Sequence, residues 1–235
     1  MREEYTRENY PSFGKKYAGE KAIISLTSWK ARIDTVSKTL YSLLKQCPGF
    51  HIVLVLSEEE FPKMMDEMPA SLKLFVKNNL IEVLWVYKNY KSFKKVLFTM
   101  DKYRDVPVIS ADDDCIYTCN YAEKLYDKWE EDKSKIVAFS AGYFFNKYYI
   151  YQGPSTLYPP NKIMMNENLL GSLNRALEVG AQDDYFISVL FKEKPISLRK
   201  KPPFVFHDSI SPISTKTYNM QDRKKLFALY ESCFS

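Results

Sequence analysis

The sequence has little glycine: 7 of its 235 residues, against 18 tyrosines and 15 phenylalanines. This composition is poor in flexible loops, so we expect disorder only near the chain ends. No segment approaches the ~18 consecutive apolar residues of a membrane-spanning helix. The first ten residues, MREEYTRENY, also lack an apolar run. We therefore expect a protein that is soluble or only peripherally bound to a membrane.

Cysteine and histidine are also scarce. The four cysteines are Cys47, Cys115, Cys119 and Cys233, and the one close pair has no histidine nearby. This spacing does not predict a zinc site, and free thiols in a reducing cytoplasm are expected. The net charge of +5 is small. It permits attraction to phosphate or anionic lipid, and it does not indicate a nucleic-acid partner.

The first half of the chain alternates apolar runs with amphipathic segments. Runs that predict strands lie at 22–26, 51–56, 80–86 and 106–110, and the helices between them are expected to begin at Asp34, near Ser71 and at Ser92. Strands and helices that alternate at intervals of roughly 25–30 residues are typical of parallel βαβ units. We therefore predict a Rossmann-like nucleotide-binding sheet, preceded by an arm at 1–20 that lies outside the core.

The second half is less regular. Helices are expected at 120–131, 167–178, 184–192 and from about residue 220, with strands at 136–141 and 196–198. The segment GPSTLYPP at 153–160 is expected to be a loop because of its glycine and prolines. The chain shows no repeat and no linker, and its length suits one sizeable α/β domain over 1–235.

Three adjacent acids, Asp112, Asp113 and Asp114, follow the fourth predicted strand. Ligands of open parallel sheets bind beyond the carboxyl ends of the strands, so these acids should lie at a ligand site. In an extended segment, side chains two residues apart point the same way, which would let Asp112 and Asp114 share one divalent cation. Carboxylate ligands favour Mg²⁺ or Mn²⁺, and the cation can hold a diphosphate. A solvated acidic turn or a helix cap is the structural alternative.

Around these acids, the run VPVISADDDCIYTCNYAEKLYDKW resembles the DXD region of bacterial GT-A glycosyltransferases that build capsule and lipopolysaccharide. The segments AIISLTSWKARI, YKSFKKV, LYPP and AQDDYFISVLF occur in the order such proteins show, and the similarity covers roughly residues 20–210. The resemblance implies a GT-A fold, with a donor-binding half at about 20–115 and an acceptor-side half at about 116–235. It also implies that Asp112 and Asp114 coordinate the metal on the donor diphosphate, with Asp113 touching the ribose or sugar.

Two further groups of residues are candidates for donor binding. Hydroxyls and a guanidinium follow the first strand and suit the base and phosphate edges of a nucleotide; they are Ser25, Thr27, Ser28 and Arg32. A structural turn with a surface arginine is the alternative. Lys94 and Lys95 begin a predicted helix, whose amino terminus attracts phosphate, and they resemble the basic pair of the family. Lysines on a solvated helix face are the alternative there.

Candidates for the base and for a third metal ligand lie further along the chain. Asp183 and Asp184 match the acidic pair that supplies the catalytic base in inverting GT-A enzymes, and the resemblance favours Asp184. A helix cap is the alternative for at least one of the pair. His207 lies where many GT-A enzymes carry a histidine that completes the metal shell; a hydrogen-bonded structural histidine is the alternative.

These patterns together predict a metal-dependent transferase that moves a sugar from a nucleotide diphosphate donor to a glycan or lipid-linked glycan hydroxyl. By analogy with the family the donor is a UDP-sugar, the cofactor Mn²⁺ or Mg²⁺, and the setting the cytoplasm or the inner membrane face. A sugar nucleotidyltransferase is the nearest enzyme alternative, but the segment SLTSWKAR lacks the glycine-rich phosphate loop of that class. A non-catalytic glycan-binding or scaffold protein on the same fold is the second alternative.

Overall fold

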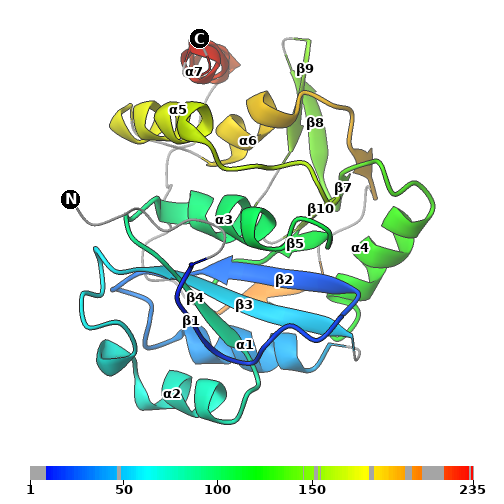
Figure 1. The fold of residues 1–235 in the computed structure, drawn as a ribbon. Helices are drawn as coiled ribbons and strands as arrows, with labels where there is room; N and C mark the ends of the chain where they lie inside the picture. Colours follow the sequence, from blue (N-terminus) through cyan, green and yellow to red (C-terminus); the bar gives the residue numbers. More distant parts are fainter. Residues whose placement is uncertain are drawn as a thin grey trace.

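A large mixed sheet forms the centre of the molecule (Figure 1). The structure is a computed structural model that describes residues 9–46, 49–144, 146–150, 153, 155–179, 183–198, 203–207, 220–232 and 234. Within these residues the sheet has the strand order β1-β4-β3-β2-β5-β10-β7-β11. The strands in chain order are β1 Ser12–Gly14, β2 Ala22–Thr27, β3 Phe50–Ser57, β4 Glu82–Val86, β5 Val108–Ser110, β7 Val137–Ala138, β10 Thr156–Tyr158 and β11 Ile196–Ser197.

The four strands predicted in the first half form a continuous parallel block within this sheet. β2 lies between β3 and β5 and is parallel to both, and β3 is parallel to β4. Every residue of β3 is buried, as its continuous apolar run requires for a strand that is covered on both faces. The prediction of a mainly parallel α/β sheet with flanking helices is therefore confirmed.

Helices cover both faces of the sheet (Figure 1). One core contains side chains of α1 Val36–Leu44, α2 Ala70–Lys77 and α4 Tyr121–Glu130. The opposite core contains side chains of α3 Lys94–Lys102, α5 Glu167–Glu178, α6 Asp183–Phe191 and α7 Met220–Ser232. Two short 3-10 turns, η1 Met64–Glu67 and η2 Lys91–Phe93, precede α2 and α3. In the described part of the chain no helix is both long and apolar enough to cross a membrane.

Two small antiparallel units extend this framework. β6 Cys115–Tyr117 pairs with β12 Phe204–Phe206, and a hairpin consists of β8 Ala141–Phe144 and β9 Lys147–Ile150. The amide of His207 donates to the carbonyl of Asp114 at 2.9 Å, which continues the β6–β12 register by one residue. The first unit brings a distant segment to the acidic triplet, and the second is a local hairpin.

The segment 153–160 is not only a loop, so that prediction was wrong. Thr156–Tyr158 forms β10, which lies inside the central sheet between β5 and β7 and is antiparallel to both. All three residues of β10 are buried. Tertiary pairing on both edges therefore outweighs the turn propensity of the glycine and prolines around this short strand.

The beginning of the chain also differs from its prediction. Residues 12–14 form the edge strand β1, which is antiparallel to β4, and Tyr10 is buried in the core. The first helix begins one residue later than expected: Thr35 occupies the N-cap position, without a side-chain cap hydrogen bond. The predicted strand at 136–141 is reduced to Val137–Ala138 in the central sheet, and Ala141 already belongs to the hairpin.

Gly14 ends β1 in a conformation that other residues rarely adopt. Its φ is +91°, and a Cβ added there would lie 2.4 Å from the carbonyl oxygen of Ile81. We expect Gly14→Ala to lower the free energy of unfolding by about 2–4 kcal/mol in urea denaturation, because it combines backbone strain with a clash against main chain. Gly19 has φ +94° and nothing within 4 Å. Gly19→Ala is therefore the matched control for strain alone, and equal losses in the two variants would contradict this account.

Candidate active site

The acidic triplet lies beyond the carboxyl end of β5, where the parallel sheet was expected to bind its ligand. β5 ends at Ser110, the amide of Ala111 still donates to the carbonyl of Ser25 at 2.8 Å, and Asp113 and Asp114 form a turn before β6. Asp113 and Asp114 therefore do not continue the strand, and strand alternation does not describe how the triplet presents its side chains. The Asp112 carboxylate contacts Lys95, and the Asp114 carboxylate contacts Arg32.

Arg32 neutralises the second and third acids. Its Nη1 lies 2.9 Å from Asp113 Oδ1 and 3.0 Å from Asp114 Oδ2. Asp113 Oδ2 accepts a further hydrogen bond of 2.6 Å from Ser28 Oγ. Arg32 and Asp113 are 4% and 5% exposed. Burial raises the pKa of Asp113, and the bonds from Ser28 and Arg32 oppose that rise. The loop after β2 thus fixes the acidic turn.

Lys95, at the start of α3, joins the first acid to the predicted catalytic pair. Its Nζ lies 2.5 Å from Asp112 Oδ1 and 3.7 Å from Asp183 Oδ2, and its side chain is 4% exposed. Burial alone would lower the pKa of Lys95, but the two carboxylates outweigh burial and raise the pKa above its usual range. Lys95 is therefore charged, and it links segments that are about 70 residues apart along the chain.

Asp184 lies in a different environment from Asp183. Burial, and then the charge of Asp183, raise the pKa of Asp184 to about 7, while Lys95 and a hydrogen bond from Tyr149 oppose the rise. The Tyr149 hydroxyl donates to Asp184 Oδ2 at 3.0 Å. A carboxylate with a pKa near neutrality matches the requirement for a general base that works at physiological pH.

His207 lies beside the acidic turn. The Thr39 hydroxyl donates its one hydrogen to the carbonyl of Asp113 at 2.8 Å and lies 3.0 Å from His207 Nε2. Nε2 must therefore carry a hydrogen to bond Thr39, which leaves a lone pair on Nδ1 of the neutral ring. Nδ1 is buried and has no hydrogen-bond partner among the described residues. Such an orphaned nitrogen, oriented by a hydroxyl on the other ring atom, is suited to bind a metal.

The other predicted donor-binding residues, Ser25, Thr27 and Lys94, form hydrogen bonds with other parts of the protein. Ser25 Oγ donates to the carbonyl of Lys95 and contacts Thr99, so this side chain faces α3 rather than the end of the sheet. Thr27 Oγ1 donates to the carbonyl of Val55 at 2.7 Å. Lys94 is 1% exposed, its Nζ donates to Asn89 Oδ1 at 2.7 Å, and burial lowers its pKa to about 8. Lys94 therefore does not lie on a solvated helix face.

The site has further neighbours besides the predicted residues. Tyr117 Oη accepts from the amide of Asp112 at 2.7 Å, and a Cβ added at Gly153 would lie 3.3 Å from Asp112 Oδ2. Thr39 contacts His207, and Tyr149 contacts Asp184. Tyr149 belongs to an aromatic run that the sequence offers for stacking on acceptor sugars, and the scarcity of glycine is a weak signal for Gly153. No sequence pattern marks Tyr117 or Thr39.

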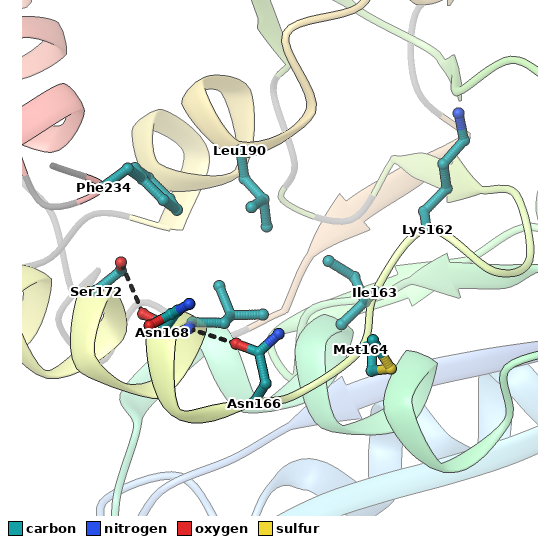
Figure 2. Close-up of a pocket in the computed structure, with 9 residues that line it drawn as sticks. Lys162, Ile163, Met164, Asn166, Asn168, Ser172, Leu190 and Phe234 are labelled. Carbon is teal, nitrogen blue, oxygen red and sulfur yellow. Dashed lines mark hydrogen bonds between the residues drawn. The ribbon is translucent and has the colours of Figure 1, made fainter.

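A pocket of about 280 Å³ lies away from this cluster. It is formed between the segment that enters α5, the α6 residue Leu190 and Phe234 near the carboxyl terminus (Figure 2). Asn166 in this pocket caps α5 by accepting from the amide of Leu169, and Ser172 donates to the carbonyl of Asn168. None of the predicted site residues lines the pocket.

Solved structures of glycosyltransferases are similar to this chain. The chain is similar to the glycosyltransferase GlyE of Streptococcus pneumoniae TIGR4, with 14% identity, a TM-score of 0.52 and coverage of 92% of this chain and 63% of that one. It is also similar to S. aureus TarS 1-349 in complex with UDP-GlcNAc, with 10% identity, a TM-score of 0.54 and coverage of 90% and 66%. A second structure of that fragment, in complex with UDP, gives 12% identity, a TM-score of 0.53 and coverage of 91% and 65%.

These likenesses establish the fold class: the chain has the α/β fold of glycosyltransferases. It spans 63% of the GlyE structure, 66% of TarS 1-349 in complex with UDP-GlcNAc and 43% of a longer TarS structure. No protein-family model matches the sequence, and a search of curated proteins finds no match.

Proposed function

We propose that this protein is a glycosyltransferase that moves a sugar from a nucleotide diphosphate donor to a hydroxyl of an acceptor glycan. One observation carries the proposal: buried Lys95 joins Asp112 at the end of β5 to Asp183 at the start of α6, next to Asp184. This contact brings a carboxylate of the DXD-like triplet and a candidate base into one cluster at the ligand-binding end of a glycosyltransferase fold. The alternatives need no such cluster.

A divalent metal is proposed for part of this cluster. In the described residues no three histidine, cysteine or acidic side chains are already arranged around one point. The donors that are present are the Asp112 and Asp114 carboxylates and the orphaned His207 Nδ1, which lies across the β6–β12 register from Asp114. We propose that these three residues hold Mn²⁺ or Mg²⁺ together with the donor. A bound cation would supply positive charge to the departing diphosphate.

The remaining residues of the cluster bind the donor and orient its reacting end. Ser28 and Arg32 hold Asp113 in place for a ribose or sugar hydroxyl. Lys95 supplies a fixed positive charge for the phosphates, and Lys94 a second amine at the start of the same helix. Thr27 lies at the same end of the sheet. Ser25 is expected to act through Lys95, because its hydroxyl bonds that residue's carbonyl.

Asp184 is the proposed base. The ionised carboxylate would accept the proton of the acceptor hydroxyl as that oxygen attacks the anomeric carbon and the bond to the diphosphate breaks. A single displacement of this kind inverts the anomeric configuration. Burial raises the pKa of Asp184 to about 7, so the transfer rate should increase as the pH rises through this value.

The donor and the acceptor are proposed as chemical classes. A UDP-sugar donor is supported by the fold of TarS 1-349, which was solved with UDP and with UDP-GlcNAc. A glycan or lipid-linked glycan of surface polysaccharide synthesis is the proposed acceptor, and the cytoplasm or the inner membrane face the proposed setting. A glycan-binding scaffold on the same fold would have no catalytic use for the His207 imidazole or the Lys95 bridge. Such a scaffold should bind nucleotide without metal dependence, or not at all.

Thermal shift with a panel of nucleotide diphosphates and nucleotide sugars tests the donor site. With Mn²⁺ present, one nucleotide should raise the melting temperature by several degrees, because a ligand that binds only the folded state stabilises it by mass action. The shift should be lost without metal and in the variant with Asp112→Asn and Asp114→Asn, which preserves side-chain volume. Asp105→Asn, on an unrelated turn, is the control. A folded protein that responds to no nucleotide would contradict the proposal.

A further inference from the structure

Tyr149 connects the β8–β9 hairpin to the carboxylate proposed as the base. Its hydroxyl donates to Asp184 Oδ2 at 3.0 Å, across 35 positions of sequence. Only 5% of Tyr149 is exposed. The residue lies in the aromatic run YFFNKYYIYQ, and the sequence alone does not distinguish one tyrosine of this run from another. The contact with Asp184 distinguishes Tyr149 from its neighbours.

The ring of Tyr149 is fixed by packing. It lies 4.9 Å from the ring of Tyr185 and 6.1 Å, edge to face, from that of Phe227. The next residue of the hairpin, Ile150, donates its amide to Ser188 Oγ at 2.9 Å, and Ser188 Oγ donates to the carbonyl of Asp184 at 2.6 Å. Hairpin and helix are therefore joined at two points one helical turn apart. A side chain locked in this way can hold its partner in a single orientation.

The direction of the hydrogen bond is settled by charge. Burial, and then the negative charge of Asp184, raise the pKa of Tyr149 above its usual range, so the phenol remains protonated and acts as the donor. A neutral donor favours the ionised form of the carboxylate it bonds. Burial, Asp183 and Asp112 disfavour the ionisation of that carboxylate, and Lys95 and Tyr149 favour it. Burial, and then the charges of Asp184 and Asp183, raise the pKa of the Tyr158 phenol, so this group also stays protonated.

We propose that Tyr149 is a positioning residue that holds the Asp184 carboxylate in place as the proton acceptor. The inference rests on the proposed role of Asp184 as base. It adds that the base is competent only when the β8–β9 hairpin is docked on α6. Lys95 fixes the same acidic pair from the donor side, so the base is held between the donor-binding helix and the hairpin.

The test compares Tyr149→Phe with Tyr148→Phe. Tyr148 belongs to the same hairpin, where its ring pairs with that of Tyr143, which is 57% exposed. Removing the Tyr149 hydroxyl should move the acidic limb of the kcat profile upward by about one pH unit, because a hydrogen bond to a charged group is lost. Transfer below this limb should fall roughly tenfold, with KM for the donor unchanged. Tyr148→Phe should leave the profile in place.

A second measurement does not require activity. The melting temperature between pH 4 and 8 should report the ionisation of Asp184, and Tyr149→Phe should extend its pH-dependent fall to higher pH in the wild-type background but not in Asp184→Asn. If Tyr149→Phe overlays Tyr148→Phe in both measurements, the inference is overturned. A shifted melting profile with transfer that survives Asp184→Asn would instead overturn the proposed base, and the inference with it.

Discussion

Asp184→Asn should lower kcat for sugar transfer roughly 10²- to 10⁴-fold, the usual contribution of a general base, and leave the affinity for the donor nearly unchanged. Asparagine keeps the volume of the carboxylate and still accepts a bond from Tyr149, so the site should not collapse. What is lost is the ability to take a proton. Initial rates and donor titration in the presence of Mn²⁺ measure the two effects separately.

Asp183→Asn is the matched control. Asp183 faces Lys95 rather than Tyr149, and we expect a weaker effect on kcat. A loss of activity in Asp183→Asn with retention in Asp184→Asn would transfer the base role to Asp183. Retained anomeric configuration in the product would contradict a single displacement by either residue.

Although Asp184→Asn should lower activity, it should raise the free energy of unfolding near neutral pH. The folded pKa of Asp184 is about 7, well above the ordinary value of 3.8 from which burial raises it. Between these values the folded state keeps a proton that the unfolded state has lost, so wild-type stability falls as the pH rises from about 4 to about 7. Asp184→Asn removes this fall and should be the more stable protein at pH 7.5. Chemical denaturation at several pH values measures the difference, and parallel profiles would contradict the raised pKa.

The parallel part of the fold was predictable because its signal is local. A run such as HIVLVL can be buried on both faces only as a covered strand, and β3 is such a strand. The position of Asp112 followed from the rule that ligands bind beyond the carboxyl ends of parallel strands. Strand β10 was missed because three residues next to turn-forming glycine and proline carry almost no periodicity. Its place between β5 and β7 is decided by pairing with segments far away in sequence.

The sequence suggested many of the residues of the site, but it did not predict which groups these residues contact. Ser25 lies in a strand covered on both faces, so composition could not show that its hydroxyl faces α3. The sequence suggested His207 only by resemblance, and the pairing of β6 with β12 brings it to Asp114. Buried polar partners such as Thr39 are chosen by three-dimensional geometry, which no spacing in the chain records.

Arg32→Met should be among the most destabilising single substitutions in the chain. Nη1 of Arg32 contacts both Asp113 and Asp114, and the arginine and Asp113 side chains are 4% and 7% exposed. Methionine fills much of the same space but leaves the buried carboxylate of Asp113 and the partly buried carboxylate of Asp114 without their cation. Removing one partner of a buried ion pair typically costs about 3–5 kcal/mol, because the remaining charge is uncompensated. Urea denaturation at pH 8 measures the loss.

The deficit of Arg32→Met should depend on pH in a defined direction. Burial already raises the pKa of Asp113, and Arg32 opposes this rise, so the substitution should raise that pKa further. A group whose folded pKa is raised loses stability as the pH increases through the affected range, and the variant extends this range upward. The difference from wild type should therefore be larger at pH 8 than at pH 5.

Adding Asp113→Asn to Arg32→Met should recover part of the loss at pH 8, because one unpaired charge is then gone. A deficit below about 1 kcal/mol, or one that does not change with pH, would mean that the acidic turn is solvated and not held by Arg32. In that case the donor site would be assembled by its ligand instead of by the fold.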